Sequence, residues 1–83
     1  MSKRVFVKVI ISIDEIGKVT PIQLTWPDGR EFLIDRLLDV RPAPAKSGGS
    51  GIRYTCRIQG REVPIYQDPI YGKWWCDGRD DVS

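Results

Sequence analysis

The sequence predicts a mainly β protein, a small antiparallel β-barrel of SH3-like or related type with about six strands. Five β-branched residues occupy every second position, as on one face of a strand: Val5, Val7, Val9, Ile11 and Ile13. Apolar and polar residues alternate again over 52–59. Between them, the WPDGR segment at 26–30 is typical of a hairpin turn. An open antiparallel sheet with one short helix is the alternative, but a closed barrel leaves fewer exposed strand edges.

The first two strands are expected to be antiparallel neighbours. Residues 14–18 break the alternation of the first strand, and Gly17 can adopt the positive φ that a hairpin loop needs. The second strand is expected over 19–26, with Ile22 and Leu24 on the same face. Pro21 has no amide hydrogen to donate, which indicates a sheet edge or a bulge.

The third strand, expected after the WPDGR turn, loses its phase between Ile34 and Val40. A bulge near residues 35–36 restores the alternation, and a short helix over 34–38 is the rival interpretation. We favour the strand because Pro42 and Pro44 are expected to end whatever precedes them.

The RPAPAKSGGSG segment at 41–51 is the one stretch with linker composition, and we expect a flexible loop over 42–51. Two domains of about 40 residues each are near the limit for independent folding, so 1–83 is interpreted as a single domain. Further strands are expected over 52–59, 63–65 and 73–76, and a polar tail over 79–83.

The composition bears on the cellular compartment of the protein and on the class of ligand that it binds. The net charge of +2, from 13 basic and 11 acidic residues, does not by itself indicate a polyanionic ligand. No apolar run is long enough to span a bilayer, and Lys8 interrupts the N-terminal one, so we expect a cytoplasmic protein without a membrane segment. Cys56 and Cys76 lack the spacing of a zinc site and are interpreted as half-buried hydrophobic residues. No cofactor or metal is predicted.

Catalysis is not expected. The sequence has no histidine, which excludes imidazole chemistry and a His-containing metal site. Asp35 and Asp39 each lie close to an arginine in the sequence, a pattern more typical of surface ion pairs than of an active site. A weaker signal is an anion contact in the Gly/Ser loop through Lys46, Gly48 and Gly49, although the glycines precede a strand and not the helix of a P-loop.

A basic face is the strongest functional signal. Arginines over a β surface with an adjacent ring are typical of single-stranded nucleic-acid binding, where guanidinium groups neutralise phosphates and a ring stacks on a base. Tyr66 is the candidate stacking residue. The candidate phosphate ligands are Arg53, Arg57 and Arg61, together with Arg36 and Arg41. The ordinary alternative is a solvated strand face whose arginines pair with Glu62 or Asp35.

Protein interaction is the alternative function. Trp74 and Trp75 are adjacent and must point to opposite faces of a strand, so one is expected in the core and the other at the surface. An exposed tryptophan is a good anchor for a protein partner. Strand edges near Pro21 or Pro64 add a second mode of contact, strand addition.

Three segments carry a resemblance to known proteins: WPDGR at 26–30, IDRLLDVR at 34–41 and GIRYTCRI at 51–58. They are similar to segments that recur in a group of short, uncharacterised proteins of Gram-positive bacteria, over most of the chain from Val5 to Trp75. The resemblance implies a bacterial relationship and supplies neither an activity nor a site.

Overall fold

The computed structural model describes residues 2–45 and 49–79, and these form seven strands and no helix. The mainly β fold is therefore confirmed. The strands are β1 (Ser2–Ile13), β2 (Val19–Thr25), β3 (Glu31–Leu33), β4 (Arg36–Pro44), β5 (Ser50–Ile58), β6 (Arg61–Gln67) and β7 (Trp74–Arg79). Within this part of the chain, no helix exists that could cross a membrane.

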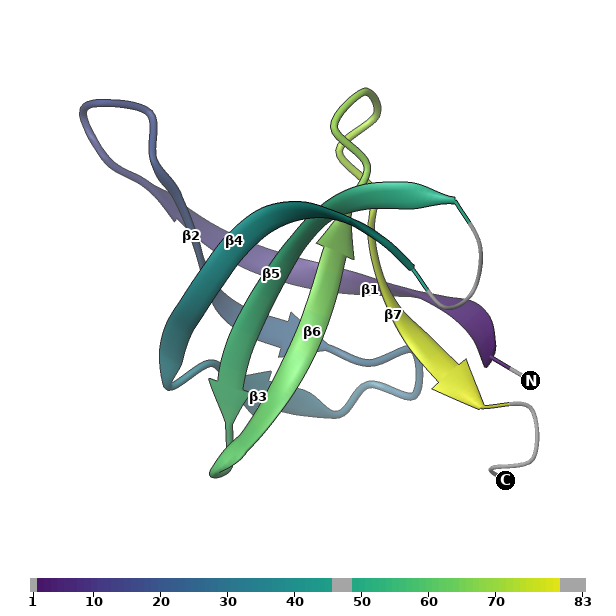
Figure 1. The fold of residues 1–83 in the computed structure, drawn as a ribbon. Coiled ribbons are helices and arrows are strands. Elements are labelled where there is room, and N and C mark those ends of the chain that lie inside the picture. Colours follow the sequence, from purple (N-terminus) through teal and green to yellow (C-terminus); the bar gives the residue numbers. More distant parts are fainter. Residues whose placement is uncertain (1, 46–48, 80–83) are drawn as a thin grey trace.

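The strands form one antiparallel sheet in the order β3-β2-β1-β7-β6-β5-β4, and the sheet curls into a half-barrel (Figure 1). The long strand β1 joins its two parts. Residues 2–7 of β1 pair with β7, whereas residues 8–13 pair with β2. β6 and β7 share only two pairs, Tyr66 with Trp75 and Gln67 with Trp74. The sheet is therefore continuous but opens where these strands diverge.

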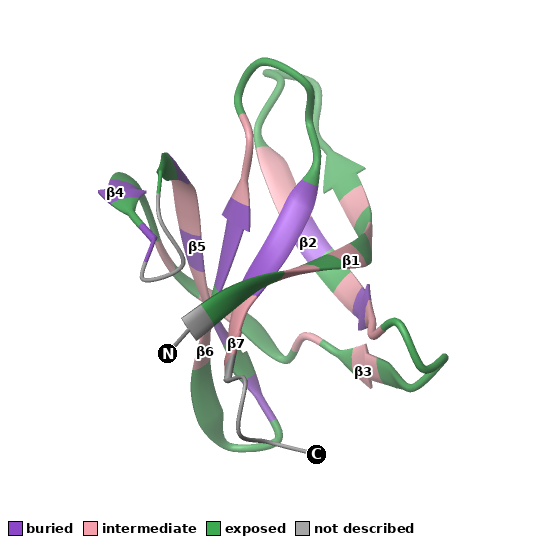
Figure 2. Ribbon diagram, turned by 90° about the vertical axis from the view of Figure 1, so that its right-hand side faces the viewer, coloured by how far each residue is buried: buried purple, intermediate pink, exposed green. Residues whose placement is uncertain are grey.

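The main core fills the inside of the curl. Its buried members come from β2, β5, β6 and β7: Leu24, Tyr54, Cys56, Ile58, Ile65, Trp74 and Cys76. Half-buried residues of β1 pack against them, among them Val7, Val9 and Ile11. The turn between β1 and β2, residues 14–18, is exposed, as is the β5–β6 turn at residues 59–60 (Figure 2). Cys56 and Cys76 are free thiols, and both are buried, beyond the half-burial expected from the sequence.

Both hairpins predicted near the N-terminus are confirmed. Asp14 Oδ1 accepts hydrogen bonds from two backbone N–H groups, and Gly17 has a φ of 85°. In the second turn, Gly29 has a φ of 93° and its N–H donates to the Trp26 carbonyl at 2.9 Å. The backbone N–H of Arg30 donates to Asp28 Oδ1 at 3.0 Å and is the largest cause of the lowered pKa of Asp28. Local turn chemistry therefore sets these two reversals.

Two β-bulges change which face of the sheet some side chains point to, compared with the prediction. The register between β1 and β2 skips Ile22, which confirms the irregularity expected at Pro21 but puts Ile22 on the opposite face to Leu24. Ile22 is 43 % exposed and Leu24 is 4 % exposed, so the prediction that they share a face was wrong. The expected third strand divides into β3 and β4, and its bulge lies at Leu38, slightly later than predicted.

The predicted loop over 42–51 was wrong at both ends. β4 continues through Pro44, which pairs with Ser50 at the start of β5. Because β4 is an edge strand, its prolines can leave their missing donors on the unpaired side. Residues 46–48 lie outside the described part. The polar tail also begins later than expected, because Arg79 still pairs with Ser2, and residues 80–83 are not described.

Candidate functional site

The sequence-predicted arginines lie mainly on the convex side of β4, β5 and β6, opposite the core. Directly paired residues of antiparallel strands point to the same face of a sheet. The register places Arg36 opposite Arg57 and Arg41 opposite Arg53. We call this surface the outer face, and its members are Arg36, Asp39, Arg41, Arg53, Thr55, Arg57, Glu62, Pro64 and Tyr66.

The two arginine pairs are the unusual feature of the outer face. Like charges directly opposite each other in a sheet are destabilising. Glu62 lies opposite Arg57 on β6, and Asp39 binds Arg41 at 2.6 Å. The outer face thus holds four guanidinium groups and two carboxylates, which leaves it positively charged. Arg36 and Arg57 form no ion pair with any carboxylate in the described part of the chain.

An open depression of about 330 Å³ lies on the outer face between β5 and β6. It is lined by Arg53, Thr55, Glu62, Pro64 and Tyr66. The Nε atom of Arg53 is buried and has no hydrogen-bond partner among the described residues. Burial and then the negative charge of Asp77 raise the pKa of Tyr66, and the nearby Arg53 partly offsets this. The depression therefore has one positive group, Arg53, whose Nε donor is unsatisfied, and one carboxylate, Glu62.

Tyr66 cannot serve as the predicted stacking ring. It is 4 % exposed, and its ring stacks against Trp75 with centroids 5.6 Å apart and an interplanar angle of 14°. Trp75, the partner of Tyr66 on β7, stacks on the ring, and almost none of the Tyr66 side chain is left exposed. A base cannot reach the ring, so this part of the interpretation was wrong.

Arg61 does not belong to the outer face. It pairs with Ile58, a member of the main core, so its side chain leaves the inner side of β6. Glu62 occupies the position on the outer face instead. The alternation of Arg61 with Val63 and Ile65 along β6 was the signal that could have shown this.

The adjacent tryptophans point to opposite faces as predicted, but neither is exposed. Trp74 is 8 % exposed in the main core, and Trp75 is 1 % exposed in a second, smaller cluster with Ala45 and Tyr66. The guanidinium carbon of Arg4 lies 4.2 Å from the centroid of the Trp75 ring. The prediction of an exposed tryptophan anchor was therefore wrong, since residues from distant segments cover Trp75.

The loop contact predicted from Lys46, Gly48 and Gly49 is described only at Gly49. Its carbonyl accepts a hydrogen bond from the Ala45 N–H at 3.0 Å, and its φ is 72°. A Cβ atom there would meet Arg4 Nη2 at 3.0 Å. Gly49 therefore lies close to Arg4, while Lys46 and Gly48 lie outside the described residues.

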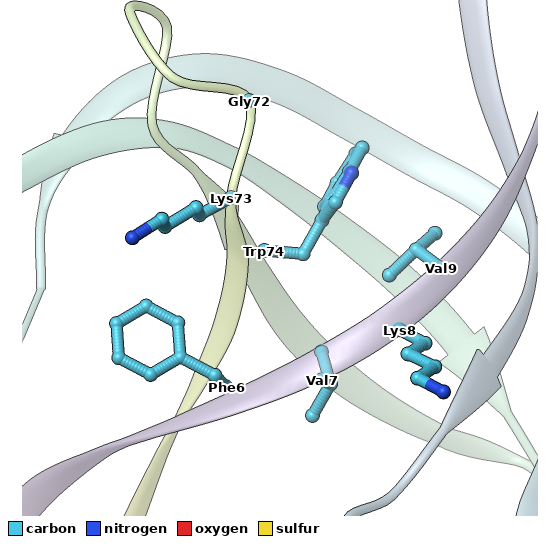
Figure 3. Close-up of a pocket in the computed structure, with 7 residues that line it drawn as sticks. All are labelled: Phe6, Val7, Lys8, Val9, Gly72, Lys73 and Trp74. Atoms are coloured by element: carbon cyan, nitrogen blue, oxygen red, sulfur yellow. The ribbon is translucent and has the colours of Figure 1, made fainter.

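A groove of about 500 Å³ beside β1 was not foreseen from the sequence. It forms where β1 diverges from β7, with Trp74 and Val9 lying between the two strands (Figure 3). Phe6 at its border is 53 % exposed, and Lys73 Nζ lies 5.9 Å from the centroid of its ring. The remaining lining residues are Val7, Lys8 and Gly72.

Known proteins give no further guide to these surfaces. Comparisons with protein-family models, curated proteins and solved structures found no match. In the described ranges, no three His, Cys, Asp or Glu residues are grouped to hold a metal ion. The chemistry is therefore inferred from the side chains themselves, above all from guanidinium groups, which bind carboxylates and phosphates.

Proposed function

We propose that the protein is a non-enzymatic binding module on a small, SH3-like β-barrel, and that its outer face binds single-stranded nucleic acid. The observation that supports this is the strand register, which places Arg36 directly opposite Arg57 and Arg41 directly opposite Arg53 on the outer face. Two opposed guanidinium groups repel each other until an anion lies between them. A phosphate beside Arg36 and Arg57 would relieve their repulsion, whereas at the second pair it would add to the carboxylate of Asp39 that already binds Arg41.

The spacing of the two pairs suits the phosphate backbone of an extended single-stranded nucleic acid. Arg53 and Arg57 are four positions apart along β5, which corresponds to roughly 13 Å at the usual rise of a strand. Because Tyr66 is covered, the outer face offers charge without a stacking ring. We therefore expect binding that tracks the phosphate backbone, depends steeply on salt and has little sequence preference.

Fluorescence anisotropy of a labelled oligothymidine, measured over a series of salt concentrations, tests this proposal. Four phosphate contacts predict a slope of about −2.8 for log affinity against log salt, at about 0.7 per contact. Arg57→Gln should weaken binding and reduce the slope by about 0.7. Arg61→Gln, a substitution on the other face of the same hairpin, is the matched control and should bind normally.

The proposal is contradicted if the protein does not bind at low salt, or if Arg61→Gln weakens binding as much as Arg57→Gln. A labelled duplex of the same sequence completes the experiment. Tighter binding to the duplex would contradict the single-stranded preference.

A protein-interaction module is the second candidate, and the half-paired strand β1 favours it. Each half of β1 pairs on one side only, and the groove at Phe6 lies where its partners change. A second copy could add a strand there and cover Phe6. Light scattering after size exclusion should then show a dimer that Phe6→Lys dissociates; a monomer at all concentrations contradicts this candidate.

We also propose a bacterial, cytoplasmic location. The two free thiols support a reducing compartment, since oxidising compartments favour disulfides. The bacterial origin rests on the resemblance to short Gram-positive proteins and stays a prediction.

A further inference from the structure

A second pocket lies on the opposite side of the sheet from the outer face. Its volume is about 270 Å³, and it lies open to solvent between the β2–β3 hairpin and the β5–β6 hairpin. Five of its lining residues are apolar: Leu24, Trp26, Phe32, Ile58 and Val63. The other three are Arg30, Gln59 and Arg61. We call it the inner pocket.

The two arginines of the inner pocket differ in their partners. Arg30 binds Asp28 through Nε at 2.6 Å, and its guanidinium carbon lies 5.8 Å from the centroid of the Phe32 ring. Arg61 is exposed and forms no ion pair within the described ranges. No described residue that lines the pocket is acidic. One guanidinium is therefore engaged, and the other remains available to a ligand.

We propose that the inner pocket binds a small organic anion that has an apolar, preferably aromatic, body and one carboxylate. Ligand sites commonly combine an apolar lining with a few polar groups, and the mouth of a β-barrel is one of their usual places. The apolar body would lie against Trp26, Ile58 and Val63, and the carboxylate would bind Arg61 at the rim. The inference does not depend on the proposed function, because no residue of the outer face takes part.

The expected contribution of Arg61 follows from its chemistry. A guanidinium can donate two parallel hydrogen bonds to a carboxylate, and such charge-assisted bonds are stronger than neutral ones. Near the rim, water weakens this gain, so we expect roughly a tenfold preference for a carboxylate over a neutral ligand of the same shape. The volume of about 270 Å³ limits the body to about one substituted ring.

Nuclear magnetic resonance titration with 4-phenylbutyrate and with 4-phenyl-1-butanol tests the proposal, since the two probes differ mainly in charge. In the wild-type protein, both probes should shift the Trp26 indole N–H signal, and the carboxylate should bind roughly tenfold more tightly. Arg61→Gln should remove that preference, whereas Arg61→Lys should retain part of it because the charge remains. Arg57→Gln is the control and should leave both affinities unchanged.

Three results would overturn the inference. They are the absence of saturable shifts at Trp26, equal affinities of the two probes in the wild-type protein, and an equal loss of preference in Arg57→Gln. A spectrum of each variant without probe should show that it is folded, because both arginines are exposed and their substitution leaves the strand pairing unchanged. Any change in affinity then arises at the pocket.

Discussion

Replacing Gly51 with alanine tests the packing of Trp75 with a single methyl group. A Cβ atom at this position would lie 2.7 Å from Trp75 Cη2 and 2.8 Å from the carbonyl oxygen of Gln67. Neither neighbour is free to move, because Trp75 is 1 % exposed and Gln67 belongs to the paired strand β6. The backbone of Gly51 lies outside the left-handed region, so glycine is needed here for space and not for conformation.

The expected cost has two opposing parts. Overpacking of a buried site destabilises by about 1–3 kcal/mol. Replacing glycine with alanine restricts the unfolded chain and returns about 0.4–1 kcal/mol. We therefore expect Gly51→Ala to lower the free energy of unfolding by about 1–2 kcal/mol, which lowers the urea midpoint by roughly 1 M. Near-ultraviolet circular dichroism should report the altered surroundings of Trp75.

Gly78→Ala provides the matched comparison. Its Cβ atom would also meet a neighbour at 2.7 Å, but that neighbour is Val5 Cγ2, a side-chain methyl of a half-buried residue. The smaller obstacle predicts a smaller loss of stability than at Gly51. If Gly51→Ala is as stable as the wild-type protein and its aromatic spectrum is unchanged, the close packing of Trp75 against β5 is refuted.

Three further predictions concern the thiols, the arginine pairs and the core. Burial raises the pKa of Cys56 to about 11 and that of Cys76 to about 12, from 9.0. The unfolded chain therefore loses its thiol protons first as pH rises, so stability should fall above pH 9 in urea titrations, and less so when both residues are alanine. Arg36→Gln removes one like-charge contact and should raise the free energy of unfolding by about 0.2–1 kcal/mol at low salt, while weakening oligonucleotide binding; a loss of stability would contradict the repulsion. Ile65→Val should cost about 0.5–1.5 kcal/mol because Ile65 is fully buried, whereas Ile70→Val at an exposed site should cost nothing measurable.

Local chemistry explains which parts of the fold were predictable. The turns at Asp14 and Asp28 depend on residues within a few positions of one another, and the alternation from 52 to 59 shows directly as β5. The extension of β4 through Pro42 and Pro44 was not predictable in this way. Whether a proline ends a strand depends on whether its missing donor faces a partner, and that is decided by the position of β4 at the sheet edge.

The site was less predictable because its side chains are covered by distant parts of the chain. Trp75 is buried by Arg4 near the N-terminus, Ala45 after β4 and Tyr66 on β6. The sequence of β7 alone does not predict these contacts. In contrast, the face to which Arg61 points could have been predicted from the sequence. Arg61 and the buried Ile65 are four positions apart on one strand and therefore point to the same face.

The β5–β6 hairpin presents an arginine on each face of the sheet, and this separates the two binding proposals. Arg57 points to the outer face and Arg61 to the inner pocket, although only four positions separate them. A specific loss of oligonucleotide binding should follow the first substitution, and a specific loss of carboxylate preference the second. If a variant that melts at the wild-type temperature loses both activities, the assignment of the two arginines to separate surfaces is wrong. Reciprocal losses can arise only when the two guanidinium groups act on separate surfaces.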